Sequence, residues 1–175
     1  MTLHPFLTPQ QIDSLNSKLA ESISRDYEKI LQPKESILVI ITLKGALLFA
    51  SDLIRKITVP IHVDFVRLAS YGSGTKSSGE VRFLKDIESS PEGKHILVLD
   101  EIIDSGRTWD FLQKRLGAAH PKSLKVCTLL SKPSRREINV NIDYLGQEVE
   151  DKFLVGYGLD FNEDYRNLKE IFYVE

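Results

Sequence analysis

The chain has 175 residues, of which 42% are hydrophobic and 27% are charged, as in a globular protein with its own core. The formal net charge of −2 excludes a strongly basic chain, so we expect neither a nucleic-acid nor a membrane partner. The first nine residues do not resemble a signal peptide and no apolar stretch could span a bilayer, so we expect one cytoplasmic domain over residues 1–175.

An amphipathic helix is predicted over residues 8–31. Thr8 can cap this helix, Pro9 suits its first turn, and Gln11 completes a Thr-x-x-Gln capping box. Apolar side chains recur along it at helical spacing, at Ile12, Leu15, Leu19 and Ile23.

Apolar strands then alternate with helices. We predict strands over residues 37–43, 61–69, 80–87, 95–99, 124–131 and 153–157, and helices over residues 45–57 and 107–117. This alternation is typical of an α/β domain in which helices cover both faces of a parallel sheet. The Gly/Ser-rich stretch YGSGTKSSG, residues 71–79, suits either a mobile lid or a plain surface loop.

The single cysteine, Cys127, lies in the apolar stretch LKVCTLL. One cysteine cannot form an internal disulfide, which agrees with a reducing, cytoplasmic setting. No His or Asn stands beside it in the sequence, so we interpret Cys127 as a buried structural side chain rather than a nucleophile.

Charged residues follow four of the predicted strands. The residues at these ends are Lys44 with Gly45, Asp100 with Glu101, Lys132 with Arg135 and Arg136, and Asp160. In open α/β sheets, ligands bind outside the carboxyl ends of the strands. The convergence of four charged strand ends therefore predicts one binding site at this edge of the sheet.

The turn from Asp104 to Thr108 leads from a strand into a helix. Gly106 lets the backbone close around an anion, and the free N–H groups of a helix N-terminus favour a phosphate there. The alternative is that Asp104 or Ser105 merely caps the helix. The turn lacks the Gly-x-x-x-x-Gly-Lys-Ser/Thr spacing of an ordinary P-loop.

Two acids, Asp100 and Glu101, stand just before this anion-binding turn. A sugar phosphate would explain both features, because carboxylates accept hydrogen bonds from ribose hydroxyls and help to hold Mg²⁺ beside phosphate oxygens. The alternative is a solvated acidic pair at a strand end.

The stretch GKHILVLDEIIDSGRT, residues 93–108, resembles the segment with which type I phosphoribosyltransferases bind 5-phosphoribosyl 1-pyrophosphate (PRPP). Within that family, the chain is most similar to the bacterial hypoxanthine (hypoxanthine-guanine) phosphoribosyltransferases. The matching segments are residues 43–45, 63–72, 77–86, 93–108, 129–136 and 153–168, in that order. The resemblance implies a mainly parallel central sheet flanked by helices, with a small hood from the terminal segments.

The activity that this resemblance implies is a step of purine salvage. The 5-phosphoribosyl group of PRPP would pass to hypoxanthine, and to guanine, giving IMP or GMP and pyrophosphate with Mg²⁺ as cofactor. The implied partners are PRPP, a 6-oxopurine and further copies of the chain, in a dimer or a tetramer.

The resemblance also implies a role for individual residues. Leu43, Lys44, Gly45 and Arg166 would bind pyrophosphate, and the peptide bond before Lys44 can be cis in this family. The ribose would contact Asp100 and Glu101, which with Asp160 would hold the metal. The 5-phosphate would bind to Asp104, Ser105, Gly106, Arg107 and Thr108. Asp104 would also be the catalytic general acid or base near the purine N7. The purine would contact Lys132, at its 6-oxo group, together with Phe153, Leu154 and Asp160. Ser70 and Tyr71 would open the lid.

Two residues depart from the family pattern. The acidic pair is usually Glu then Asp, whereas this chain has Asp100 then Glu101, which leaves open which acid contacts which ribose hydroxyl. Trp109 replaces a smaller aliphatic residue, and we interpret it as packing. Three alternative functions stay open: a regulator that binds PRPP and RNA, a phosphoribosyltransferase for another base such as xanthine, and an α/β domain without a ligand.

Overall fold

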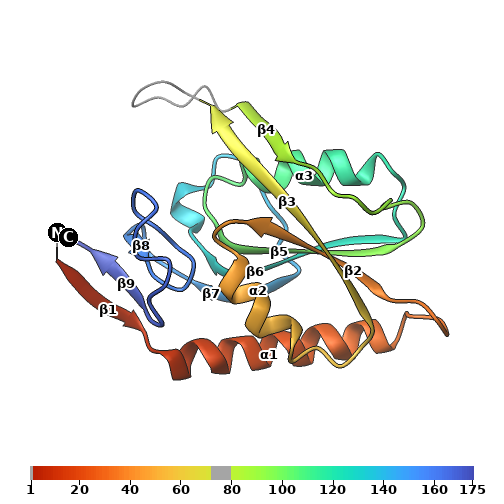
Figure 1. Cartoon of the computed structure of the whole chain (residues 1–175), viewed down its shortest axis with the longest axis horizontal. Helices are drawn as coiled ribbons and strands as arrows, with labels where there is room; N and C mark the ends of the chain where they lie inside the picture. Colours follow the sequence, from red (N-terminus) through yellow and green to blue (C-terminus); the bar gives the residue numbers. More distant parts are fainter. Residues whose placement is uncertain (1, 72–79) are drawn as a thin grey trace.

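The computed structural model describes residues 2–71 and 80–175 of the chain (Figure 1). Its elements are β1 (Leu3–Leu7), α1 (Pro9–Glu28), β2 (Ile37–Leu43), α2 (Leu47–Ile54), β3 (Ile61–Tyr71), β4 (Glu80–Lys85), β5 (His95–Ile103), α3 (Arg107–Gly117), β6 (Ser123–Ser131), a 3₁₀ turn (Pro133–Arg135), β7 (Tyr144–Glu148), β8 (Phe153–Val155) and β9 (Ile171–Val174). The predicted helices and strands are all present. Most of the loop interpreted as a lid, residues 72–79, lies outside the described residues.

The first helix begins where the capping box predicted. The Thr8 hydroxyl accepts a hydrogen bond from the Gln11 N–H at 3.3 Å, and the Gln11 side chain accepts one from the Thr8 N–H at 2.8 Å. Both bonds satisfy donors that the first turn of a helix would otherwise leave unpaired. The helix ends at Glu28, earlier than predicted.

The central sheet has the strand order β4-β3-β2-β5-β6-β7. Only the edge pair β3–β4 is antiparallel among these pairings, so the predicted, mainly parallel α/β fold is confirmed. Helix α1 runs along one side of the sheet, and α3 lies on the other (Figure 1).

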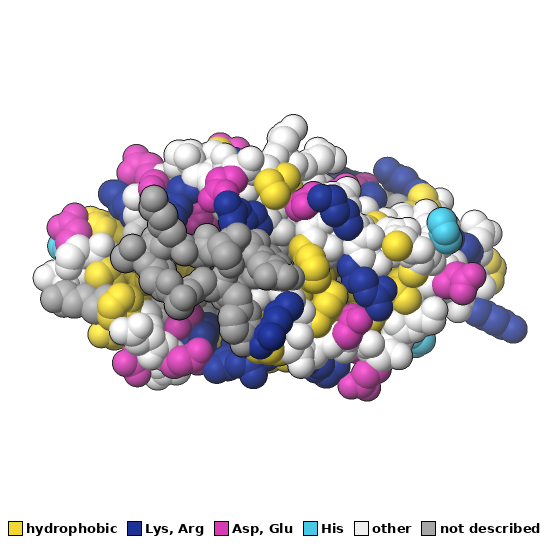
Figure 2. Space-filling model, turned by 90° about the horizontal axis from the view of Figure 1, so that it is seen from above, with side chains coloured by type: hydrophobic (Ala, Val, Ile, Leu, Met, Phe, Trp, Pro, Cys, Tyr) yellow, Lys and Arg dark blue, Asp and Glu magenta, His cyan; other side chains and the backbone are white. Residues whose placement is uncertain are grey.

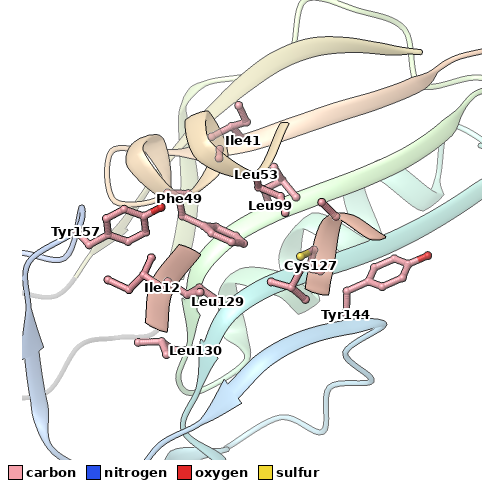
Figure 3. Close-up of a cluster of buried hydrophobic side chains, with 14 of the residues drawn as sticks. Ile12, Ile41, Phe49, Leu53, Leu99, Cys127, Leu129, Leu130, Tyr144 and Tyr157 are labelled. Carbon is pink, nitrogen blue, oxygen red and sulfur yellow. The ribbon is translucent and has the colours of Figure 1, made fainter. Parts of the chain in front are cut away.

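The core has two parts because side chains alternate across the buried strands. Along β2, Val39 and Ile41 pack with α1 and α2, whereas Leu38 and Ile40 pack with α3. Figure 3 shows the first of these clusters, in which the fully buried Cys127 lies among apolar side chains. The structural interpretation of Cys127 is confirmed, as is that of Trp109, which is 4% exposed in the second cluster.

A second, three-stranded sheet of order β1-β9-β8 joins the two ends of the chain and forms the predicted hood. Strand β1 pairs antiparallel with β9, and the Thr2 N–H donates to the Glu175 carbonyl at 2.9 Å. The termini therefore lie side by side (Figure 1). The sequence did not predict β1, β7 or β9 as strands.

Candidate active site

A cavity of about 470 Å³ opens where β2 and β5 stop pairing. The two strands are paired from Ile37↔His95 to Ile41↔Leu99, which is the last paired position in the described residues. Beyond it, Thr42 and Leu43 on one strand and Asp100 and Glu101 on the other line the cavity. The separation of two central strands thus creates the binding space at the carboxyl edge of the sheet.

The cavity gathers many of the predicted site residues. Those that line it are Leu43, Lys44, Gly45, Asp100, Glu101, Thr108, Asp160 and Arg166. Sequence reasoning missed Thr42, Arg67, Leu68, Ile102 and Glu163, which line the same cavity. No local signal marks either residue: Arg67 is one of several polar residues in β3, and Glu163 is one of several acids just before Arg166.

Asp100 and Glu101 lie close together inside the cavity. The Thr42 hydroxyl is 2.6 Å from Asp100 Oδ1 and 3.0 Å from the Leu99 carbonyl oxygen. Burial raises the pKa of Asp100, and burial together with the charge of Asp100 raises the pKa of Glu101 well above its usual value. A cation bound beside the pair would favour its ionised form.

Two glycines allow the chain to pass close to Glu101. A Cβ on Gly45 would overlap the Glu101 carboxylate, and a Cβ on Gly158 would overlap the Gly45 carbonyl oxygen. Gly158 also has φ +99, a conformation that favours glycine. The peptide bond between Leu43 and Lys44 is cis. The loop at Lys44 therefore lies directly between Glu101 and the segment that leads to Asp160.

Two cations at this end of the cavity are paired with acids. Lys44 Nζ is 2.7 Å from Glu163 Oε2, and Arg166 Nη2 is 2.8 Å from Asp160 Oδ1. Arg166 also donates to the Gly158 carbonyl at 2.8 Å, which fixes its direction. The hydrogen bond from Lys44, with further help from Arg166, lowers the pKa of Glu163.

The turn before α3 has the features of an anion site. Gly106 has φ +88 and immediately precedes the helix, and the N–H groups of Gly106 and Thr108 have no hydrogen-bond partner among the described residues. Gly106 is the N-cap residue of α3, and its position has no side chain that could accept a capping hydrogen bond. The backbone N–H of Arg107 donates to the Ser105 hydroxyl only at a long distance of 3.4 Å. These observations favour the anion site over the capping alternative.

Asp104 and Lys132 lie outside the cavity lining but are linked to each other. Arg135 Nε is 3.0 Å from Asp104 Oδ1, although this buried oxygen makes no hydrogen bond with any described residue. Arg135 also contacts Asp151 at 3.4 Å, and Asp151 is 3.9 Å from the buried Lys132 ammonium. The three strand ends of β5, β6 and β7 thus bring an acid and a lysine into one cluster.

The aromatic residue predicted to stack on a base is accessible. Phe153 is 49% exposed and meets the ring of Phe161 edge-on, with centroids 5.6 Å apart. Leu154, by contrast, is buried, so only its backbone could contact a ligand. Ser70 and Tyr71 end β3, but the positions of their side chains lie outside what the structure describes, so their lid role stays a prediction.

The carboxylates of the cavity fit Mg²⁺, a hard cation that takes oxygen ligands and usually shares them with substrate phosphates and water. Asp100 and Glu101 supply such oxygens, and a cation would offset their mutual repulsion. Within residues 2–71 and 80–175, no three His, Cys, Asp or Glu side chains gather into a metal site. This donor set suits an ion shared with a substrate better than an ion enclosed by protein.

None of the helices in the described part of the chain is both long and apolar enough to cross a membrane. Acidic and basic side chains intermingle over the face seen in Figure 2.

Comparisons with known proteins identify the family of the chain. The family model described as a phosphoribosyl transferase domain matches residues 9–162. Hypoxanthine-guanine phosphoribosyltransferase of Mycobacterium tuberculosis is 43% identical over 166 residues, which are 94% of this chain and 82% of that protein. Hypoxanthine phosphoribosyltransferase of Salmonella typhimurium is 39% identical over 154 residues, 88% of this chain and 86% of that protein.

A crystal structure of a hypoxanthine-guanine phosphoribosyltransferase from Bacillus anthracis has a TM-score of 0.89 and 42% identity, covering 98% of both chains. The crystal structure of a hypoxanthine phosphoribosyltransferase from Staphylococcus aureus has a TM-score of 0.91 and 35% identity, and the match covers 98% of this chain and 91% of that one. The fold, the cavity and these relatives together show that the chain belongs to the phosphoribosyl transferase family.

Proposed function

We propose that this chain is a hypoxanthine(-guanine) phosphoribosyltransferase of purine salvage. It transfers the 5-phosphoribosyl group of PRPP to a nitrogen of hypoxanthine or guanine and releases pyrophosphate. One observation carries the proposal: a single cavity joins an acidic pair, Asp100 and Glu101, to an unpaired helix N-terminus at Thr108 and to the cations Lys44 and Arg166. A sugar with a phosphate at one end and a pyrophosphate at the other matches that combination of charges.

The 5-phosphate of PRPP binds at the turn from Asp104 to Thr108 in this proposal. The N–H groups of Gly106 and Thr108 point to no protein acceptor in the described chain, and they and the helix dipole stabilise the phosphate. The Ser105 and Thr108 hydroxyls and the Arg107 side chain complete the predicted set. Asp100 and Glu101 then accept hydrogen bonds from the ribose hydroxyls.

Pyrophosphate leaves from the end of the cavity that holds Leu43, Lys44, Gly45 and Arg166. As the bond to the anomeric carbon breaks, negative charge grows on the leaving group, and the two cations stabilise it. Magnesium, shared between the substrate and Asp100, Glu101 and Asp160, would supply further positive charge to that group. Both Asp160 oxygens already have partners, since Oδ2 accepts from the Glu163 N–H at 2.9 Å and Oδ1 is 2.8 Å from Arg166 Nη2, so a metal ion would share Asp160 with these groups.

The purine binds beside Asp104 and Lys132. Asp104, whose side chain is 41% exposed, holds or releases a proton at the purine N7. The Lys132 ammonium donates to the 6-oxo group, which favours hypoxanthine and guanine over adenine. Phe153 offers an exposed ring face for stacking, and backbone groups at Leu154 contact the edge of the base.

The chain also acts as a cytoplasmic homo-oligomer, a dimer or a tetramer, in this proposal. Leu47 and Val63 are 49% and 40% exposed, and a subunit contact would bury them.

The test is a spectrophotometric assay with PRPP and Mg²⁺, run separately with hypoxanthine, guanine, xanthine and adenine. We expect nucleotide from hypoxanthine or guanine and none from adenine. A folded protein that binds PRPP but converts none of the four bases would contradict the proposal and favour the regulator instead.

A further inference from the structure

The Glu163 carboxylate lies between the two cations proposed to bind pyrophosphate. Its Oε2 is 2.7 Å from Lys44 Nζ, and its Oε1 is 3.4 Å from Arg166 Nη2. Each oxygen of one carboxylate thus contacts a different cation, as two oxygens of a phosphate group would. No other described acid contacts both of these cations.

The backbone around Glu163 directs its side chain toward this place. Asn162 and Glu163 both have positive φ, +50 and +71, in a tight turn closed by a hydrogen bond from Asp164 N–H to the Phe161 carbonyl at 3.0 Å. The Glu163 N–H donates to Asp160. Asn tolerates this conformation, and the Phe161 N–H also donates to the Asp164 carbonyl at 3.2 Å, so two reciprocal hydrogen bonds close the turn.

The Glu163 side chain itself is only loosely fixed. It is 63% exposed, and its carboxylate pairs with the two cations Lys44 and Arg166. Asp160, the other acid on Arg166, is 30% exposed and also accepts the Glu163 N–H. Of the two acids, Glu163 is therefore the one that can leave the cavity by simple rotation.

We propose that Glu163 is a built-in competitor of the pyrophosphate group. In the ligand-free protein its carboxylate occupies the place between Lys44 and Arg166, and PRPP or pyrophosphate must displace it. The inference rests on the proposed function, because it takes these cations to be the pyrophosphate site. Its consequence is weaker binding of pyrophosphate, which favours release of this product after each turnover.

The test measures binding of inorganic pyrophosphate with Mg²⁺ to the full chain by titration calorimetry. Glu163→Gln keeps the shape of the side chain and removes its charge, and Glu163→Asn is a second variant because Asn tolerates positive φ. Exposed ion pairs are weak, so losing two of them should tighten pyrophosphate binding by about three- to tenfold. The KM for PRPP should fall in parallel while kcat stays equal or decreases.

Glu88→Gln is the matched control. Glu88 does not line the cavity and forms an exposed ion pair with Lys85 at 3.0 Å, so the control removes the same charge and a similar ion pair. Its pyrophosphate affinity and KM should equal those of the unchanged chain. Unchanged or weaker pyrophosphate binding in both folded Glu163 variants would overturn the inference.

Failure of the proposed function gives a different result. If the unchanged chain neither binds pyrophosphate nor forms nucleotide from PRPP, the function is wrong and the inference falls with it. If the unchanged chain forms nucleotide and the variants bind pyrophosphate no more tightly, the function stands and only the role of Glu163 is wrong.

Discussion

Three glycine-to-alanine substitutions separate the cost of backbone strain from that of steric overlap at Gly106, in the turn before α3. Gly106 has φ +88, and a Cβ there would lie 2.7 Å from both the Ile138 carbonyl oxygen and Val140 Cγ2. Gly93 has φ +66 but nothing within 4 Å of its added Cβ. Gly117, at the other end of α3, has neither a positive φ nor a close neighbour. A side chain at Gly106 would thus meet both backbone strain and steric overlap, one at Gly93 would meet strain alone, and one at Gly117 would meet neither.

The expected changes in the free energy of unfolding follow from these environments. Gly117→Ala should stabilise slightly, by up to about 1 kcal/mol, because alanine loses less backbone entropy on folding. Gly93→Ala should cost about 1–2 kcal/mol of left-handed strain. Gly106→Ala should cost about 2–5 kcal/mol, because overpacking adds about 1–3 kcal/mol to that strain. The overlap cannot relax easily, since the Ile138 N–H is bonded to the Ser105 carbonyl at 3.1 Å.

Urea denaturation, followed by circular dichroism, measures all three differences. The affinity for PRPP provides a second measurement. Only the Gly106→Ala variant should bind PRPP more weakly, because only this substitution displaces the turn of residues 104–108. If Gly106→Ala costs no more than Gly93→Ala and binds PRPP normally, the turn is adaptable and our account of its close packing is wrong.

Three further substitutions test the proposed chemistry and one buried histidine. Asp104→Asn should reduce kcat by about 10²- to 10⁴-fold with PRPP affinity mostly kept, and loss of PRPP binding would make Asp104 mainly structural. Lys132→Ala should lower the preference for hypoxanthine over adenine, measured as a ratio of kcat/KM, and an unchanged ratio would contradict the role of Lys132. Burial lowers the pKa of His95 below its usual 6.5, so the folded state binds the proton less well than the unfolded state. Stability should therefore decrease as the pH falls through 6.5, and His95→Gln should show a smaller decrease between pH 7 and pH 5; equal slopes for both proteins would refute this.

The sequence was informative where local pattern decides the structure. The capping box at Thr8 predicted the start of α1, and the apolar run of residues 37–43 predicted β2 with its bounds. The sequence was less informative where pairing between strands far apart in the chain decides the structure. Strand β5 continues past its predicted end at Leu99 to Ile103, because Asp100, Ile102 and Ile103 still pair with β6. Strands β1 and β9 form by pairing opposite ends of the chain, which no local window contains.

The same distinction holds within the candidate site. Residues that directly follow an apolar strand, such as Lys44 and Asp100, could be found from the sequence because the fold class places strand ends together. Glu163 could not, since its position depends on the left-handed turn at Asn162 and on two cations from distant segments. Arg67 lies within β3, and its place at the cavity follows from its pairing with Leu43 of β2, which also lines the cavity.

Charge balance explains why acids stand beside a turn proposed to bind phosphate. The acids that line the cavity are Asp100, Glu101, Asp160 and Glu163, and the cations are Lys44, Arg67 and Arg166. Two of the cations are already paired with Glu163 and Asp160, so a bare pyrophosphate would meet little free positive charge. Mg²⁺ changes this balance, because it neutralises substrate charge and is attracted to Asp100 and Glu101. We therefore expect PRPP to bind weakly without Mg²⁺, and equal affinity in a chelator would show that the acids have another purpose.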